Sequence, residues 1–171
     1  MIGYLKNRYY LYKINNIYRN NCSNKAFIIK ARSMNKLGNS VDMSARIMGP
    51  IFSQCKLYIG ANSFVGTNFH CEGNGNVKIG SNCDIAPQVT ILTGTHFIGN
   101  NKRRAGVGIT KDVVIGDGSW IGACSIIFPG ITIGNGCIIG AGALVVHNVP
   151  DNCKAIGVPA KIIPITEKEG F

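Results

Sequence analysis

The stretch Val113–Val149, which reads VVIGDGSWIGACSIIFPGITIGNGCIIGAGALVVHNV, carries a repeat of six residues. An aliphatic side chain recurs at every sixth position, at Ile115, Ile121, Ile127, Ile133, Ile139 and Val145. A mostly small residue stands two positions before the next aliphatic, at Ser119, Ser125, Cys137 and Ala143. Neither an amphipathic helix nor a plain alternating strand produces a period of six. A fixed short period of this kind indicates a repeat architecture.

The six-residue period has a simple physical interpretation. Side chains alternate between the two faces of a strand, so the aliphatic residue and the small residue two positions earlier point to the same side. Glycine, asparagine and aspartate between them tolerate positive φ and turn the chain. Each repeat is therefore predicted to be one short strand and one corner. No single repeat can bury its apolar side, so consecutive repeats must stack into a solenoid.

The same period extends toward the N-terminus, with two irregularities. It is clean from Ile59, gains two residues at Gly73–Asn76, and continues through Ile91. Residues 27–56 contain apolar side chains without a clean period, and we expect irregular first coils there. The period stops for residues 93–112 and restarts at Val113.

The interrupting segment reads TGTHFIGNNKRRAGVGITKD and is polar and basic. A long loop inside a compact domain is usually functional or disordered, and an insertion in a solenoid often builds its binding face. The segment contains His96, whereas the other two histidines, His70 and His147, lie elsewhere. His96 is therefore the first candidate for a catalytic residue.

Composition and cysteine content limit the class of protein. Hydrophobic residues make up 46% of the 171 residues, which excludes a disordered chain. No apolar run is long enough to span a membrane, and no secretory signal is evident, so we expect a cytoplasmic location. The seven cysteines form no CxxC motif. Cys71, Cys83 and Cys137 occupy inward positions, and we expect them to fill the core as small hydrophobic residues rather than to bind a metal.

The N-terminal segment is strongly basic. Residues 1–41 contain eight lysines and arginines and no acidic residue. Apolar and tyrosine side chains recur at helical spacing over residues 2–19, which predicts a basic amphipathic helix that ends at Asn20–Asn21. Three roles are open: a cap on the open end of the solenoid, contact with an anionic membrane surface at its inner face, or binding of nucleic acid. Nucleic acid ranks last, because no recognised binding motif accompanies the charge.

Several short motifs resemble one enzyme family. They are ILTGTH (91–96), WIG (120–122), PGITIG (129–134), IIGAGALV (138–145) and GVPAK (157–161). Over residues 57–164 the chain resembles the hexapeptide-repeat acyltransferases, nearest to the maltose and galactoside acetyltransferases and to relatives that O-acetylate capsules and O-antigens. The first 40 residues do not resemble the maltose-type enzymes, which favours the polysaccharide branch.

The resemblance implies a fold and an assembly. The expected fold is all-β, a left-handed parallel β-helix with three strands per coil. We expect an N-terminal cap over residues 1–35, a β-helix domain over 36–165 with the inserted loop 93–112, and a C-terminal tail over 166–171. Relatives of this kind form homotrimers whose neighbouring chains share each site.

The resemblance also implies a reaction. The expected enzyme transfers acetyl from acetyl-CoA directly to a hydroxyl of a surface polysaccharide or its precursor, without a metal. An imidazole can accept the proton of the hydroxyl near pH 7, and in the family the loop histidine does so, which gives that role to His96. The residues expected to contact acetyl-CoA are Trp120, Ala123, Ala141, His147 and Lys161. Maltose-type enzymes place an asparagine beside the sugar where this chain has Gly66, so the candidate acceptor residue is Asn68.

Other functions remain open at the level of sequence. Some hexapeptide proteins N-acetylate an amino-sugar on a nucleotide carrier, and the motifs do not separate the two reactions. A non-enzymatic β-helix that binds another protein is a more distant alternative, since it would not require the His96 segment. A carbonic anhydrase of this fold holds zinc with three histidines, and the three histidines of this chain are too scattered for that pattern.

Overall fold

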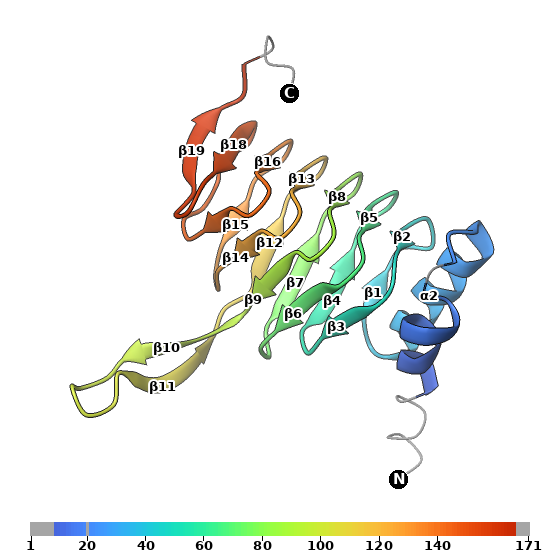
Figure 1. The fold of residues 1–171 in the computed structure, drawn as a ribbon, viewed down its shortest axis with the longest axis horizontal. Helices are drawn as coiled ribbons and strands as arrows, with labels where there is room; N and C mark the ends of the chain where they lie inside the picture. The colour runs from blue at the N-terminus through green and yellow to red at the C-terminus, as the bar shows by residue number, and fades with distance from the viewer. Residues whose placement is uncertain (1–8, 20, 167–171) are drawn as a thin grey trace.

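The chain winds into a solenoid of short parallel strands. The computed structural model describes residues 9–19 and 21–166, and they form about six turns of a left-handed parallel β-helix (Figure 1). The fold class expected from the six-residue period and the resemblance is therefore confirmed.

Each full coil contributes one strand to each of three faces, which we name after their first strands. The β1 face contains β1 (Ser40–Val41), β4 (Lys56–Ile59), β7 (Asn76–Ile79), β12 (Val113–Ile115) and β15 (Thr132–Ile133). The β2 face contains β2 (Arg46–Ile47), β5 (Phe64–Val65), β8 (Asp84–Ile85), β13 (Trp120–Ile121), β16 (Ile138–Ile139), β18 (Cys153–Ile156) and the antiparallel β19 (Lys161–Pro164). The β3 face contains β3 (Ile51–Ser53), β6 (Phe69–Glu72), β9 (Thr90–Leu92), β14 (Ile126–Ile127) and β17 (Leu144–Val145).

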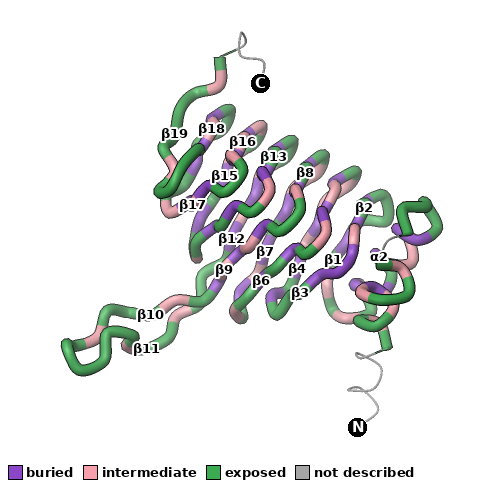
Figure 2. The backbone as a smooth tube through the Cα atoms, in the orientation of Figure 1, coloured by how far each residue is buried: buried purple, intermediate pink, exposed green. Residues whose placement is uncertain are grey.

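The aliphatic positions of the repeat form a continuous inner column. Partners on adjacent coils are Ile115 with Ile133, Ile121 with Ile139, and Ile127 with Val145. These side chains are at most 1% exposed, and the small residues two positions before them are equally buried. Figure 2 shows the alternation as purple segments along the strands, between exposed corners. The predicted direction of both side chains is confirmed.

The first coil is more regular than the sequence indicates. Val41 pairs with Ile59 and Ile47 pairs with Val65, so β1 and β2 already follow the register of the next coil. The expectation of irregular coils over residues 27–56 is wrong. The period is hidden because Ser53 stands where the column would otherwise carry an aliphatic residue, opposite Cys71 in the next coil.

Part of the range expected to be irregular coil is instead a helix. The helix α2 (Asn24–Lys36) begins after Ser23, whose hydroxyl accepts a hydrogen bond from the backbone N–H of Ala26 at 3.3 Å, as an N-cap does. Its buried side includes Ala31 and Met34, which pack against the first coil. The predicted helix over residues 2–19 is observed from residue 9, as a helical turn that continues into η1 (Lys13–Ile17). Residues 2–8 of that prediction lie outside the described residues.

These N-terminal helices, over residues 9–36, form a cap on the open end of the solenoid. Ile14 is only 2% exposed and belongs to the same core as the first coil. The side-chain amide of Asn15 accepts from the N–H of Ile51 and donates to its carbonyl, both at 2.9 Å. Asn35 pairs with the N–H and carbonyl of Val41 in the same way. The cap therefore satisfies backbone groups of edge strands, which would otherwise be open to pairing with another chain. These contacts support the cap role.

The cysteines follow the prediction only in part. Cys83 and Cys137 are fully buried thiols, and burial raises the pKa of both, so they remain protonated. Cys55 and Cys71 instead form a disulfide between adjacent coils, with their Cα atoms 5.9 Å apart. The expectation that Cys71 is a free core residue is wrong, because the coil spacing brings Cys55 within bonding range.

Candidate active site

The inserted segment is a β-hairpin rather than an irregular loop. Its strands β10 (Gly94–Ile98) and β11 (Ala105–Thr110) are antiparallel, and the hairpin projects away from the solenoid (Figure 1). It leaves the solenoid between β9 and β12, at what we name the β3–β1 corner, where the chain passes from the β3 face to the β1 face. His96 lies on β10 opposite Gly108 and is exposed.

The root of the hairpin is fixed to the preceding coil. The hydroxyl of Thr93 donates to the carbonyl of Glu72 and accepts from the N–H of Gly75, both at 3.1 Å. At the other arm, the carboxylate of Asp112 accepts from the backbone N–H of Asn76 at 2.8 Å and from its side-chain amide at 2.9 Å. These hydrogen bonds hold the pKa of Asp112 below its usual value, so the contact persists at neutral pH.

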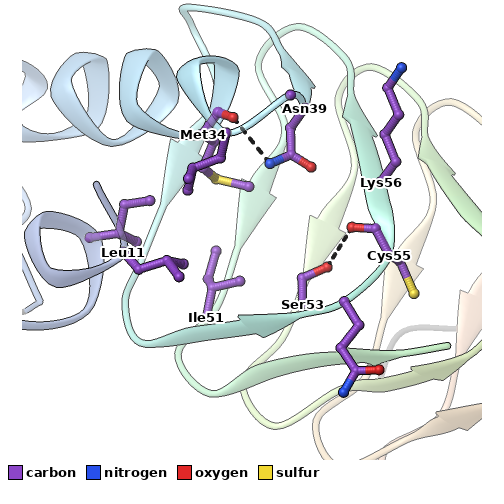
Figure 3. Close-up of a pocket in the computed structure, with 11 residues that line it drawn as sticks. Leu11, Met34, Asn39, Ile51, Ser53, Cys55 and Lys56 are labelled. Carbon is purple, nitrogen blue, oxygen red and sulfur yellow. Dashed lines mark hydrogen bonds between the residues drawn. The ribbon is translucent and has the colours of Figure 1, made fainter. Parts of the chain in front are cut away.

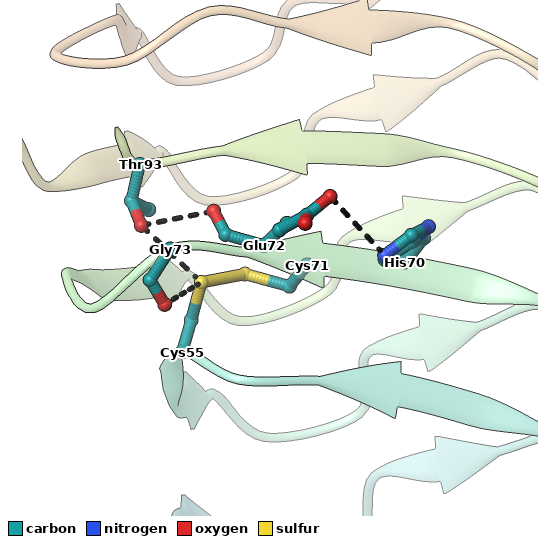
Figure 4. A network of polar contacts seen from close by, with 6 residues as sticks. All are labelled: Cys55, His70, Cys71, Glu72, Gly73 and Thr93. Atoms are coloured by element: carbon teal, nitrogen blue, oxygen red, sulfur yellow. Dashed lines mark hydrogen bonds and ion pairs between the residues drawn. A yellow bond between two sulfur atoms is a disulfide. The ribbon is translucent and has the colours of Figure 1, made fainter. Parts of the chain in front are cut away.

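The disulfide lies directly beneath this root. Figure 4 shows Cys55 and Cys71 next to Thr93 and Gly73. The Sγ atom of Cys55 is 3.4 Å from the Thr93 hydroxyl and 3.5 Å from the carbonyl oxygen of Gly73. The arm that carries His96 therefore starts from a cross-linked, hydrogen-bonded corner rather than from a flexible loop.

Beyond its root the hairpin has little to pack against within one chain. Phe97 is 60% exposed, Ile98 88% and Val107 74%. An isolated two-stranded hairpin is marginally stable at best in water, and exposed apolar groups of this size are typical of interaction surfaces. The hairpin therefore has the character of an element that packs on another molecule.

The second group of candidate residues lies around Trp120. Trp120 stands on the outside of β13 and is 46% exposed. It borders an open depression of about 360 Å³ together with Phe64, Asp84, Ala86 and Pro87. Phe64 and Asp84 were not candidates from sequence. Following the repeat from one coil to the next identifies them, because Phe64, Asp84 and Trp120 are successive partners on the β2 face.

Ala123, Ala141 and Asn68 lie along one edge, the β2–β3 corner, where the chain passes from the β2 face to the β3 face. The coils stack closely here, since a Cβ atom at Gly122 would lie 2.5 Å from the backbone nitrogen of Ala141. A Cβ at Gly66 would likewise lie 2.6 Å from the backbone nitrogen of Pro87. The position in register with the acceptor asparagine of maltose-type enzymes thus excludes any side chain, whereas Asn68 is exposed with a φ of 57°.

The remaining two candidates lie apart from each other. Lys161 is exposed on β19, at the C-terminal end of the β2 face. His147 is exposed after β17, on the β3–β1 corner, which is the corner from which the hairpin departs. The candidates therefore separate into two groups: His96 and His147 at one corner, and the others along the β2–β3 corner and the β2 face.

One side of the coil separates the two groups within a chain. Ala123 and Pro129 lie at successive corners of the coil. They are six residues apart, so at most ~20 Å of extended chain joins them. The hairpin then carries His96 further outward (Figure 1). Within a single chain, the candidate residues thus form two groups that face different directions.

A second cavity lies elsewhere. A pocket of about 350 Å³ sits between the cap and the first coil, with Leu11, Met34 and Ile51 on its apolar side and Lys56 at its rim (Figure 3). None of the candidate residues lines it. Within residues 9–19 and 21–166, no three histidine, cysteine or acidic side chains are grouped so as to hold a metal ion. No described helix is long and apolar enough to cross a membrane.

Comparison with known proteins connects this geometry to one family. Residues 105–147 match the bacterial transferase hexapeptide family (six repeats). Galactoside O-acetyltransferase of Escherichia coli K12 is 32% identical over 150 residues, which cover 86% of this chain and 74% of that enzyme. A Saccharomyces cerevisiae protein named as an acetyltransferase is 40% identical over 117 residues, which cover 64% of this chain and only 60% of that protein.

Solved structures show the same relationship. Galactoside acetyltransferase in complex with coenzyme A superimposes with a TM-score of 0.78 at 27% identity, covering 94% of this chain and 79% of that one. The polysialic-acid-specific acetyltransferase NeuO gives a TM-score of 0.63 at 30% identity, covering 77% of this chain and 60% of that one. The expectation that the first 40 residues set the chain apart from these enzymes is wrong for the structure, because the superposition covers 94% of this chain. The chain therefore belongs to the hexapeptide-repeat transferases, with galactoside O-acetyltransferases among its relatives.

Proposed function

We propose that this protein transfers acetyl from acetyl-CoA to a hydroxyl of a surface polysaccharide or its precursor, with His96 as the general base. The observation that carries the proposal is the position of His96: it is exposed on a projecting hairpin whose root is fixed by Thr93 and Asp112. The coenzyme A bound to the galactoside enzyme and the polysaccharide specificity of NeuO support the donor and the acceptor class.

The proposed reaction needs no nucleophile from the enzyme, because a thioester is already an activated acyl group. His96 accepts the proton of the acceptor hydroxyl as its oxygen attacks the thioester carbonyl. As the C–S bond of the thioester breaks, the same imidazole returns the proton to the departing thiolate, so coenzyme A leaves as the free thiol and the acetyl group remains on the sugar oxygen. A positioned base of this kind typically accelerates the reaction by ~10²–10⁴.

The β2–β3 corner suits acetyl-CoA, which is a long and narrow acyl donor. Ala123 and Ala141 leave the backbone of stacked corners uncovered, and Trp120 offers an exposed aromatic wall beside them. Lys161 supplies an exposed cation at the end of the same face for the nucleotide phosphates. His147 supplies a further hydrogen-bonding group from the β3–β1 corner. Asn68 lies further along the corner, where it would contact the acceptor.

We infer a homotrimer from the two groups of candidate residues. His96 and the groove residues lie on different corners, so one catalytic site requires the hairpin of one chain and the β2–β3 corner of a neighbour. Head-to-tail contacts of this type close into rings, and the threefold ring is the arrangement expected from the resemblance. Such packing would also cover the exposed Phe97, Ile98 and Val107.

The substitution His96→Ala tests the function. Release of free thiol from acetyl-CoA in the presence of a glycan acceptor should fall by ~10²–10⁴, while binding of coenzyme A and the melting temperature stay unchanged. His70→Ala is the matched control, since His70 is an exposed histidine on β6 with no role in the proposed site. Retention of more than about a tenth of the activity in His96→Ala would exclude the base assignment. Acceptors that offer an amine instead of a hydroxyl separate O- from N-acetylation.

We also propose that the outer side of the cap contacts an anionic membrane. Lys25, Arg32 and Lys36 are exposed on α2 at helical spacing, and Tyr12 and Ile17 are exposed on the preceding segment. Basic side chains near an anionic surface contribute about 1 kcal/mol each. Replacing the three cations with glutamine should abolish co-flotation with phosphatidylserine vesicles and leave the melting temperature unchanged. Equal flotation of the variant would limit the segment to its capping role.

A further inference from the structure

The tip of the hairpin carries three adjacent cations. Lys102, Arg103 and Arg104 are all exposed, and Asp112 at the root is the only acidic residue between positions 93 and 112. Within the described part of the chain, the three side chains form no ion pair with a carboxylate. Asp112 is itself bound to Asn76. The tip is thus a compact patch of uncompensated positive charge.

The turn that presents these cations has a defined geometry. The side-chain oxygen of Asn100 accepts from the backbone N–H groups of Lys102 at 3.0 Å and Arg103 at 3.2 Å. The N–H of Gly99 donates to the carbonyl of Arg104 at 2.9 Å, and the Arg104 guanidinium donates to the Gly99 carbonyl at 3.3 Å. A Cβ atom at Gly99 would collide with the carbonyl oxygen of Arg103. The backbone therefore holds the three charges at the end of the hairpin.

The charged tip and the proposed base lie on the same element. Ile98 pairs with Ala105, the residue next to Arg104, and His96 lies two residues from Ile98 on β10. Two strand residues span ~7 Å. A chain-like ligand held at the tip can thus continue along the hairpin to His96.

We propose that the hairpin tip binds the carboxylates of an acidic glycan, so that the acceptor is an anionic polysaccharide. This inference rests on the proposed function and adds the charge of the substrate to it. Guanidinium groups bind carboxylates in a planar, two-point geometry, which lysine lacks, so Arg103 and Arg104 would set the orientation of the chain. A patch of one sign also raises the rate of encounter with an oppositely charged polymer, in a manner that salt weakens. The acid groups of sugars next to the acetylated one would occupy the tip.

Binding of labelled oligosaccharides tests this directly. Fluorescence anisotropy is measured with oligogalacturonate as the acidic probe and a malto-oligosaccharide of equal length as the neutral probe, at increasing NaCl. The wild type should prefer the acidic probe, and salt should reduce the preference. The triple substitution Lys102→Gln, Arg103→Gln, Arg104→Gln should weaken acidic binding by roughly threefold to a hundredfold, as the loss of three exposed ion pairs predicts. Its affinity for acetyl-CoA should remain unchanged.

The control variant carries the same change of charge away from the hairpin tip, at three other exposed cations: Arg19→Gln, Lys56→Gln, Lys78→Gln. It should bind the acidic probe as the wild type does. Equal affinity for both probes in the wild type, or full acidic binding in the tip variant, would overturn the proposal. A loss confined to acetyl-CoA affinity would assign the tip to the donor instead, and preference for an oligonucleotide over oligogalacturonate would also contradict it. His96→Ala should bind oligogalacturonate normally, so failure of this inference and failure of the proposed catalysis give different results.

Discussion

The substitution Thr93→Val tests whether the hairpin root controls the position of His96. Thr93 is fully buried, and valine has nearly the same shape without the hydroxyl. The change removes the bond to the Glu72 carbonyl and leaves the N–H of Gly75, which is also buried, without its acceptor. A buried donor left unsatisfied costs about 1–3 kcal/mol. For a chain of this size, this corresponds to a fall in the melting temperature of roughly 2–12 °C.

Thermal unfolding by circular dichroism and steady-state acetyl transfer, both on purified protein, give the two readouts. Activity measured well below the melting transition should also fall, because the arm that carries His96 loses its anchor. Thr132→Val is the matched control: Thr132 is exposed on β15, so its melting temperature should stay within about 2 °C of the wild type. A Thr93→Val protein that melts and reacts like the control would refute the role assigned to the root.

Three further changes test the cap, the core and the buried lysine. Asn15→Ala removes both hydrogen bonds to Ile51 and should lower the free energy of unfolding in urea by about 1–3 kcal/mol, whereas an unchanged value would contradict the role of this contact. Ile133→Ala empties a fully buried column position and should cost about 2–5 kcal/mol, whereas a cost below 1 kcal/mol would contradict the packing described. Burial lowers the pKa of Lys30 below 10.5, so the unfolded state binds more protons between the lowered pKa and 10.5, and the free energy of unfolding should rise with pH across that window. Lys30→Met should remove this rise; an unchanged pH dependence would show that Lys30 does not cause it.

The parts of the fold that follow from sequence are those with a strict period. From Ile59 to Val145 the inward residues, all aliphatic except Cys71, recur every six positions outside the two insertions, and this alone predicts coils, corners and a continuous core. The hairpin is not predicted from the sequence, because its side chains are mostly exposed on both sides. Neither arm therefore shows the alternation of apolar and polar residues that marks a half-buried strand. The helix α2 is not predicted from the sequence, because its apolar positions resemble those of an irregular coil. Its buried Lys30 also weakens the apolar pattern.

Other features depend on spacing that a sequence does not show. Cys71 faces Ser53 in the register, and its disulfide partner Cys55 lies two residues further along, past the corner. The candidate site residues came from motifs and resemblance, and their grouping required the coil geometry. The order of the strands along the coils shows that His147 lies on the β3–β1 corner, from which the hairpin departs, and that Ala141 lies on the β2–β3 corner. Phe64 and Asp84 became candidates because the β2 face aligns them with Trp120.

In the proposed homotrimer, each catalytic site combines His96 of one chain with the β2–β3 corner of a neighbour. The most direct measurement mixes two inactive proteins, His96→Ala and Ala141→Arg, the second of which places a large side chain on the exposed corner. In mixed assemblies made from equal amounts, about a quarter of the interfaces should combine an intact His96 with an intact corner, because head-to-tail contacts join different surfaces of the two chains. Acetyl transfer should return to about that fraction of the wild-type rate. No recovery in assemblies that mass spectrometry shows to contain both chains would contradict a shared site.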